Sequence, residues 1–345
     1  MNPTVRHPTD LVAVPVVAGS TVSPITDGAV LFCDSENNNA FTVKAAGSTG
    51  TALAFGLYGD GSDGACAFDG STVVLGITPS TNVYTLTRDI YASSITVSTG
   101  VTVKTAGFRV FCTGLTSVLG TGSINCDGNA AVTTTAGVIT NANGSLGAGT
   151  AGGAGGVGNN AGSPGTNHAA GFPGGTGAGG AGGTDGTHAG AAAGTYAALA
   201  AVKGGGRYLP ALLTGTVFGT QTSGTASLAS LFMGGTGGGG AGCDNAATSG
   251  GAGGGGGGVL VLATQGLNLA GSITCTGGAG SAGISAANNA GGGGGGGGGV
   301  VIVIYSVKTG SGTITAAGGA GGAKAGASGV AGSAGTGGVV ITLQV

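Results

Sequence analysis

Charged residues are scarce in this sequence, and their scarcity limits the partners that it could recognise. Only 6% of the 345 residues are Asp, Glu, Lys or Arg, and the formal net charge is −2. Residues 1–127 hold nine acids and five bases, and residues 128–345 hold two acids and four bases, so neither part is strongly basic. Binding to a nucleic-acid backbone depends on clustered Lys and Arg side chains. The sequence therefore predicts a protein that does not bind nucleic acid.

Long apolar runs are also missing. No apolar stretch approaches the roughly 20 residues that a helix needs to span a bilayer. The N-terminal residues Met1–His7 lack the apolar core and the cleavage site of a signal peptide. We therefore expect no membrane insertion and no signal peptide. A charge-poor chain made without secretion fits a protein that assembles in the cytoplasm of a host cell and is released by lysis.

The residue patterns of catalysis, cofactor binding and metal binding are missing too. Gly-x-Gly-x-x-Gly strings do occur, but in a chain with 86 glycines they are expected by chance. The paired carboxylates of a glycosidase would have to come from Asp89 and Asp127, the two acids of residues 71–128. We expect no enzymatic activity, no cofactor and no metal site.

The cysteines show no Cys-x-x-Cys spacing, which argues against a zinc site. We interpret them as small buried hydrophobic residues, with a disulfide as the alternative. They are Cys33, Cys66, Cys112, Cys126, Cys243 and Cys275.

What the sequence has in excess is glycine, at 86 of 345 residues, against a usual share near 7%. Disordered chains usually combine high net charge with few β-branched residues, whereas this chain has a low net charge and clear Val, Ile and Thr runs. Ordering a glycine costs more backbone entropy than ordering any other residue. We therefore expect an ordered protein in which dense hydrogen bonding and close backbone contact offset that cost.

Two matched units and part of a third make up residues 253–345. A glycine run followed by Val-Leu-Val-Leu at 259–262 and Gly-Ser-Ile-Thr at 271–274 has a counterpart 41 residues later, with Val300–Ile304 as the apolar run and Gly-Thr-Ile-Thr at 312–315. A further 39 residues on, Gly-Gly leads into Val339–Leu343. A repeat of roughly 20–50 residues is typical of a solenoid. The sequence predicts a stack of units, each a pair of strands plus a glycine-rich excursion.

Three consecutive seven-residue units, each closed by Gly, extend this pattern toward the N-terminus over residues 94–114. Alternation places Ile95, Val97, Val101 and Val103 on one face, with Thr and Ser on the other. Short strands at this spacing are typical of the rungs of a parallel β-helix. Residues 110–127 also match residues 259–276 at an offset of 149, so the solenoid begins before the glycine-rich half.

A three-residue period governs the segment from Gly144 to Gly186, where twelve of the fifteen positions counted in steps of three are glycine. This period fits a left-handed polyproline-II-type helix, which has three residues per turn. One edge of such a helix carries no side chain, so neighbouring helices can approach closely and bond laterally. We favour a packed polyglycine-II bundle. A collagen triple helix and a flexible linker are the alternatives, but only two prolines lie in this segment.

These patterns together predict an all-β fold, in which parallel β-helix (β-solenoid) rungs are interleaved with a packed polyglycine-II helical bundle. Residues 1–70 form a small β-rich attachment domain with strands expected at 11–17, 30–32 and 40–43, and residues 71–128 form the solenoid rungs. Residues 129–258 are a glycine-rich excursion with an apolar cap at 196–233. Residues 259–345 are the repeat units.

The glycine runs leading into Val-Val-Ile-Val and the long Gly-Gly-x-Gly excursions resemble glycine-rich bacteriophage virion fibre proteins. They are similar in particular to tail-fibre-tip adhesins with polyglycine-II helices, over roughly residues 144–338. The resemblance implies that the glycine segments are a scaffold and that aromatic and polar residues of the connecting loops contact the host receptor. Carried over by position, these receptor-binding candidates are His168, Phe172, His188, Tyr196, Tyr208 and Phe218.

We therefore expect a non-enzymatic phage virion surface protein, a fibre or spike that helps to attach the particle to its host. Its expected partners are other virion proteins, through the N-terminal region, a host cell-surface receptor, and further copies of itself. The alternative is a capsid-decorating or self-assembling fibre subunit, in which exposed strand edges polymerise.

Overall fold

The computed structural model describes the strands within residues 1–52 and, beyond them, residues 57–138, 144, 146–164, 180–194, 234–244, 248–285 and 288–345. These residues are all-β, with parallel sheets and no helix, which confirms the predicted fold class at that level. The described residues accordingly hold no helix that could cross a membrane. The chain divides into two compact units, Met1–Asp60 and Gly61–Val345.

The first unit contains a four-stranded sheet in the order β1-β2-β3-β4. Its strands are β1 (Val16–Val17), β2 (Ala29–Asp34), β3 (Ala40–Ala45) and β4 (Thr51–Ala52). β1 and β2 are parallel, whereas β3 is antiparallel to β2 and to β4. The strands predicted at 30–32 and 40–43 are confirmed as parts of β2 and β3. Of the strand predicted at 11–17, the stretch 11–15 lies outside the described residues.

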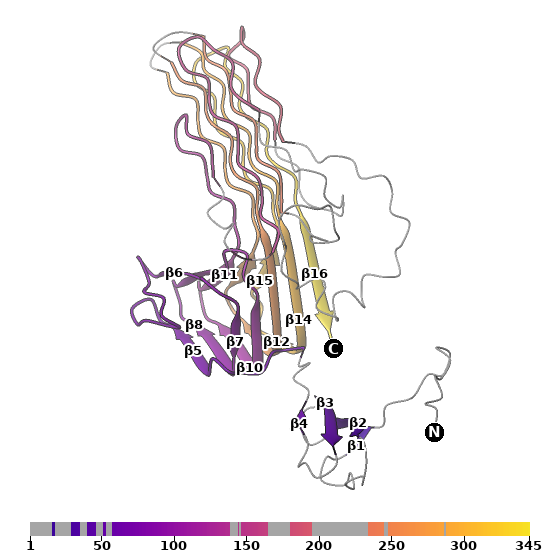
Figure 1. Ribbon diagram of the computed structural model, residues 1–345. Helices are drawn as coiled ribbons and strands as arrows, with labels where there is room; N and C mark the ends of the chain where they lie inside the picture. Colours follow the sequence, from indigo (N-terminus) through magenta and orange to yellow (C-terminus); the bar gives the residue numbers. More distant parts are fainter. Residues whose placement is uncertain are drawn as a thin grey trace, which may run out of the picture. The chain divides into compact units, whose positions relative to one another are not determined.

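The second unit is built on two sheets in which all paired strands are parallel (Figure 1). The seven-stranded sheet holds β5 (Ala65–Phe68), β7 (Ile90–Ala92), β8 (Ser94–Val97), β10 (Val110–Val118), β12 (Val259–Leu269), β14 (Val300–Thr309) and β16 (Val339–Gln344). The five-stranded sheet holds β6 (Val83–Thr85), β9 (Thr102–Lys104), β11 (Ser123–Asn125), β13 (Ser272–Thr274) and β15 (Thr313–Thr315). From β8 onward the chain passes alternately from one sheet to the other.

The repeats of 41 and 39 residues found in the sequence equal the offsets at which the C-terminal strands pair. Val259 of β12 pairs with Val300 of β14, and Val300 pairs with Val339 of β16, so the first residues of the three apolar runs lie side by side. β13 and β15 follow the same repeat, because Ile273 pairs with Ile314. The strands of successive units therefore pair side by side and parallel, in the register of the repeat.

The sequence match at an offset of 149 residues agrees with the pairing of one pair of strands and not of the other. β11 and β13 pair at this offset, but Val110 of β10 pairs with Leu262, at 152, and Leu115 pairs with Gly266, at 151. An irregularity between Cys112 and Leu115 changes the register, because β10 has one more residue there than β12, as in a β-bulge. A Cβ at Gly114, inside this irregularity, would lie closer than 3.0 Å to a backbone oxygen.

The three seven-residue units at 94–114 do not pair with one another. The first unit forms β8 in the seven-stranded sheet and the second forms β9 in the five-stranded sheet. Ile95 of β8 pairs with Thr116 of β10, and Val103 of β9 pairs with Ile124 of β11. In both pairs the partner residue lies 21 residues further along the chain. The predicted inward face is confirmed, because Ile95, Val97, Val101 and Val103 are all at most 2% exposed.

A single apolar cluster includes inward-facing side chains of both sheets of the second unit. Ile124 of β11 and Ile273 of β13 belong to the same buried cluster as Leu262 of β12 and Val303 of β14. Five cysteines are free buried thiols, as predicted for small hydrophobic residues, and burial raises the pKa of the Cys66 thiol to about 11. The other four are Cys112, Cys126, Cys243 and Cys275.

Glycine-rich segments run on from the seven-stranded sheet and lie side by side (Figure 1). Residues 250–258 lead into β12, residues 291–299 into β14 and residues 328–338 into β16. Backbone hydrogen bonds join neighbouring segments at every third residue. The N–H groups of Gly251, Gly254 and Gly257 donate to the carbonyls of Gly291, Gly294 and Gly297, each at 2.9 Å. The N–H groups of Gly235, Gly238 and Ala241 donate to the carbonyls of Gly257, Gly254 and Gly251, at 2.7–2.9 Å.

These two sets of bonds show that a segment can bond to a parallel or to an antiparallel neighbour. Between segments 251–257 and 291–297 the residue numbers of donor and acceptor rise together, so these segments run parallel. Between segments 235–241 and 251–257 the donor number rises as the acceptor number falls, so these run antiparallel. Such close approach requires glycine. A Cβ at Gly296 would lie closer than 3.0 Å to the carbonyl oxygen of Gly255, nearer than real Cβ atoms come.

Candidate receptor-binding tip

The turns that join the glycine-rich segments lie together at the ends remote from the strands. We call their described residues the tip; they are residues 157–160, 184–188, 243–244, 248–249, 284–285, 288–289 and 324–329. Single β-bridges connect Val157 to Ser249 and Ser249 to Ile284. The N–H of Val330 donates to the carbonyl of Thr184, which places the turn at 184–188 beside the last segment.

The distance of the tip from the sheet follows from the length of the segments. Residues 250–258 separate Ser249 in the tip from the first residue of β12. Nine extended residues span at most roughly 30 Å. The tip is thus a cluster of side-chain-bearing turns set apart from the sheets by segments composed largely of glycine.

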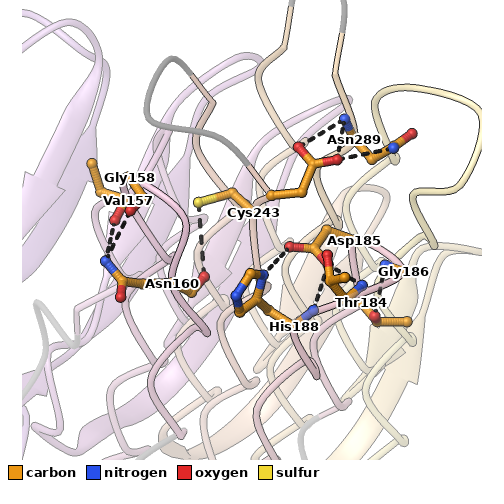
Figure 2. Close-up of polar contacts among 11 residues, drawn as sticks. Val157, Gly158, Asn160, Thr184, Asp185, Gly186, His188, Cys243 and Asn289 are labelled. Carbon is orange, nitrogen blue, oxygen red and sulfur yellow. Dashed lines mark hydrogen bonds and ion pairs between the residues drawn. The ribbon is translucent and has the colours of Figure 1, made fainter.

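The turn at Val157–Asn160 has the chemistry of a tight turn. Gly158 and Asn159 both have positive φ, at 66° and 69°, a region that Gly and Asn enter more readily than other residues. The Asn160 Nδ2 donates to the carbonyl of Val157 at 2.6 Å (Figure 2). The Cys243 Sγ donates to the carbonyl of Asn160 at 3.7 Å, which joins this turn to its neighbour.

Asn289 links three turns. Its Nδ2 donates to the Asp244 carboxylate at 2.9 Å, and its backbone N–H donates to the same carboxylate at 3.1 Å (Figure 2). Its Oδ1 accepts from the N–H of Ser328 at 2.9 Å. These side-chain bonds fix the turns relative to one another, so the tip presents a defined surface.

His188 is held by Asp185 in the same tip (Figure 2). The His188 Nδ1 lies 2.9 Å from Asp185 Oδ2, and the backbone N–H groups of Thr187 and His188 both donate to Asp185 Oδ1 at 2.6 Å. Burial by itself would raise the pKa of Asp185, but these hydrogen bonds lower it below its ordinary value. Because an ionised carboxylate only accepts, the proton lies on Nδ1 and neutral His188 has Nε2 as an acceptor. The His188 side chain is 29% exposed, so it can meet a ligand.

We expect the Asp185→Asn variant to reduce the stability of the tip at neutral pH but not in acid. A carboxyl group whose pKa is lowered on folding contributes stability above its unfolded pKa, near 3.9, and loses it as the pH falls through the folded value. Hydrogen bonds to charged groups contribute about 1.5–3 kcal/mol, so the deficit should be of this order at pH 7. Amide exchange of residues 184–188, followed from pH 7 to pH 2, measures it. A deficit that stays constant into acid would contradict the assignment.

Of the six predicted receptor-binding residues, His188 lies in the tip. The other five, His168, Phe172, Tyr196, Tyr208 and Phe218, lie outside the described residues. Sequence reasoning did not select Asp185, Asn159, Asn160, Asp244 or Asn289. Their signal was an Asp or Asn at several of the points where a glycine-rich run is interrupted, which is typical of turns.

Asp89 and Asp127, the carboxylates considered for glycoside hydrolysis, are each bonded to their own neighbours. Asp89 forms an ion pair with Arg109, next to β10 of the seven-stranded sheet. Asp127 accepts from the N–H of Thr276 at 2.6 Å and from the Thr274 hydroxyl at 3.0 Å, beyond the five-stranded sheet. Burial raises the pKa of Asp127. No group of three or more His, Cys, Asp or Glu residues that could hold a metal ion occurs in the described part of the chain.

Comparison of the chain with family models, curated proteins and solved structures finds no match. The tip must be interpreted from its own geometry.

Proposed function

We propose that this protein is a non-enzymatic bacteriophage virion surface protein, a fibre or spike whose tip contacts the host surface. The observation that carries the proposal is that the glycine-rich segments and the polar side chains of the turns occupy different places. Glycine is the commonest residue of the segments, and polar side chains gather in the turns at the far end, including His188 and Asn159. An attachment protein needs such side chains at a place that reaches a surface.

We also propose that the glycine-rich segments form a bundle of polyglycine-II helices on a β-solenoid. Hydrogen bonds at every third residue support the bundle, because three residues per turn returns each N–H to the same neighbour. Alternation of the chain between two parallel sheets around one apolar core supports the solenoid. Such a bundle should resist proteases, since its backbone groups bond internally and it offers few cleavable side chains.

The N-terminal unit would join the protein to other virion proteins, and the tip would meet the receptor. In this proposal the protein is made in the host cytoplasm and acts at the virion surface, without a cofactor and without nucleic acid. The alternative is a capsid-decorating or self-assembling fibre subunit. The observation that favours it is β16, which pairs with β14 on one side and with no described strand on the other.

The test compares two double variants in binding to bacterial envelopes. His188→Ala with Asn159→Gly removes two tip side chains, and glycine tolerates the positive φ of residue 159. Thr85→Ala with Thr87→Ala is the matched control, because both threonines are exposed and lie at the end of the unit near β6. We expect the tip variant to bind at least about tenfold more weakly, equivalent to about 1.4 kcal/mol, and the control to bind as the unchanged protein does.

Cosedimentation of labelled protein with envelopes from a panel of bacteria measures the binding, and negative-stain microscopy shows the particles. Equal binding by the tip variant and the unchanged protein would contradict attachment through these side chains. Regular filaments or shells formed without any envelope would favour the structural alternative.

A further inference from the structure

The last two glycine-rich segments leave an edge of unpaired backbone groups. Within the described residues, the N–H and C=O groups of Ala331, Ala334 and Gly337 have no hydrogen-bond partner, although N–H groups of the intervening Gly332, Gly335 and Gly338 all donate to residues 316–322. The N–H groups of Ala317, Ala320 and Ala323 are likewise unpaired in this part of the chain. All six of these edge residues are exposed.

β16, which directly follows residues 331–338 in the chain, extends this edge. It pairs only with β14 among the described strands, so its other side offers a second row of strand donors and acceptors. Val340, whose partner Val301 is fully buried in the core, is 41% exposed. Residues 331–345 thus present one continuous edge of roughly 45 Å, at ~3.1 Å per residue in the glycine-rich part and ~3.3 Å in the strand.

The chemistry of this edge restricts what can cover it. Neighbouring segments inside the structure approach so closely that a Cβ at the contact would lie closer than 3.0 Å to a carbonyl oxygen, as at Gly332 and Gly335. A partner that bonds in the same way must therefore be an extended segment with glycine wherever a Cβ would face the edge. This chain itself contains glycine-rich segments, and they accept both parallel and antiparallel neighbours.

We propose that the edge formed by residues 317–323 and 331–345 is the surface through which a second copy of this chain binds. The second copy places a glycine-rich segment against the unpaired N–H and C=O groups, and β16 gains a strand on its open side. The interface extends the hydrogen-bonding pattern that already joins segments 251–257 and 291–297. It lies on the flank of the segments and does not depend on host attachment through the tip.

The test uses a variant that blocks the edge without breaking a bond inside the chain. Ala331→Glu with Ala334→Glu adds two charged side chains at exposed positions whose N–H groups are unpaired. Ala154→Glu with Ala161→Glu is the matched control, because both alanines are exposed, lie on either side of the turn at Val157–Asn160 and do not belong to residues 317–323 or 331–345. Analytical ultracentrifugation over a wide range of concentrations should show assembly of the unchanged protein and the control, and association at least about tenfold weaker for the edge variant.

Amide exchange of the unchanged protein provides a second measurement that needs no variant. The N–H groups of Ala331, Ala334 and Gly337 should exchange fast in dilute solution and become protected as the concentration rises. A protein that stays monomeric at every concentration would overturn the proposal, as would an edge variant that assembles as well as the unchanged protein. Protection that persists in the dilute monomer would mean that the same chain covers the edge, and would also overturn it.

Discussion

Replacement of Gly296 by alanine should lower the free energy of unfolding by about 3 kcal/mol or more, because the new methyl group has no space. Gly296 is buried in the segment that leads into β14, and its Cβ would lie closer than 3.0 Å to the carbonyl oxygen of Gly255. Relief requires the two segments to separate, which also weakens the hydrogen bonds between them. Chemical denaturation followed by circular dichroism measures the loss.

Gly337→Ala is the matched control for this prediction. A Cβ at Gly337 has as its nearest neighbour the carbonyl oxygen of Ala316 at 3.6 Å, an ordinary contact, and the residue is exposed. The φ angle of Gly337 is not positive, so an alanine can adopt the same backbone conformation. Alanine there should leave stability unchanged or raise it by up to about 1 kcal/mol, since it restricts the unfolded chain. Equal destabilisation by both substitutions would show that glycine is needed for its backbone freedom and not for close packing.

Replacement of Leu262 by alanine should destabilise the second unit by about 2–5 kcal/mol, the range for deletion of a large side chain from a packed core. Leu262 is fully buried in β12, between Val110 of β10 and Val303 of β14. Its loss leaves a cavity in the cluster to which both sheets contribute. Because the glycine-rich segments continue from the strands, thermal unfolding of the sheets and of the segments should shift together.

Leu115→Ala is the comparison on the same sheet. Leu115 lies in β10 and is 48% exposed, so its truncation should cost less than about 1 kcal/mol. Thermal unfolding of both variants, followed by circular dichroism, gives the difference. A cost for Leu262→Ala as small as that for Leu115→Ala would contradict a common core between the two sheets.

The alternating residues of β8 and β9 show why part of this fold could be predicted. In a strand, successive side chains point to opposite faces, so Ile95, Val97 and Val103 could be assigned inward from their spacing alone. The same residues gave no information on which strands pair. The units at 94–100 and 101–107 are adjacent in sequence and closely similar, yet they form β8 and β9 in different sheets.

The candidate site was less accessible to sequence reasoning. His188 was selected through a resemblance, and Asp185, which holds its ring, was not selected at all. Their contact depends on the conformation of a turn that also brings the N–H groups of Thr187 and His188 to one carboxylate oxygen. Asp244 and Asn289 are far apart in the sequence, and no local pattern shows that they meet.

The sequence by itself determined the local conformations, namely short strands with a period of two and glycine-rich segments with a period of three, because these periods come from side-chain spacing along the chain. The repeat of the C-terminal units also determined that like strands would stack. Only the tertiary structure decided which glycine-rich segments are neighbours, in which direction they run and which edge is left open. Those choices are made by backbone N–H and C=O groups, which are alike at every glycine and therefore leave no trace in the order of the residues.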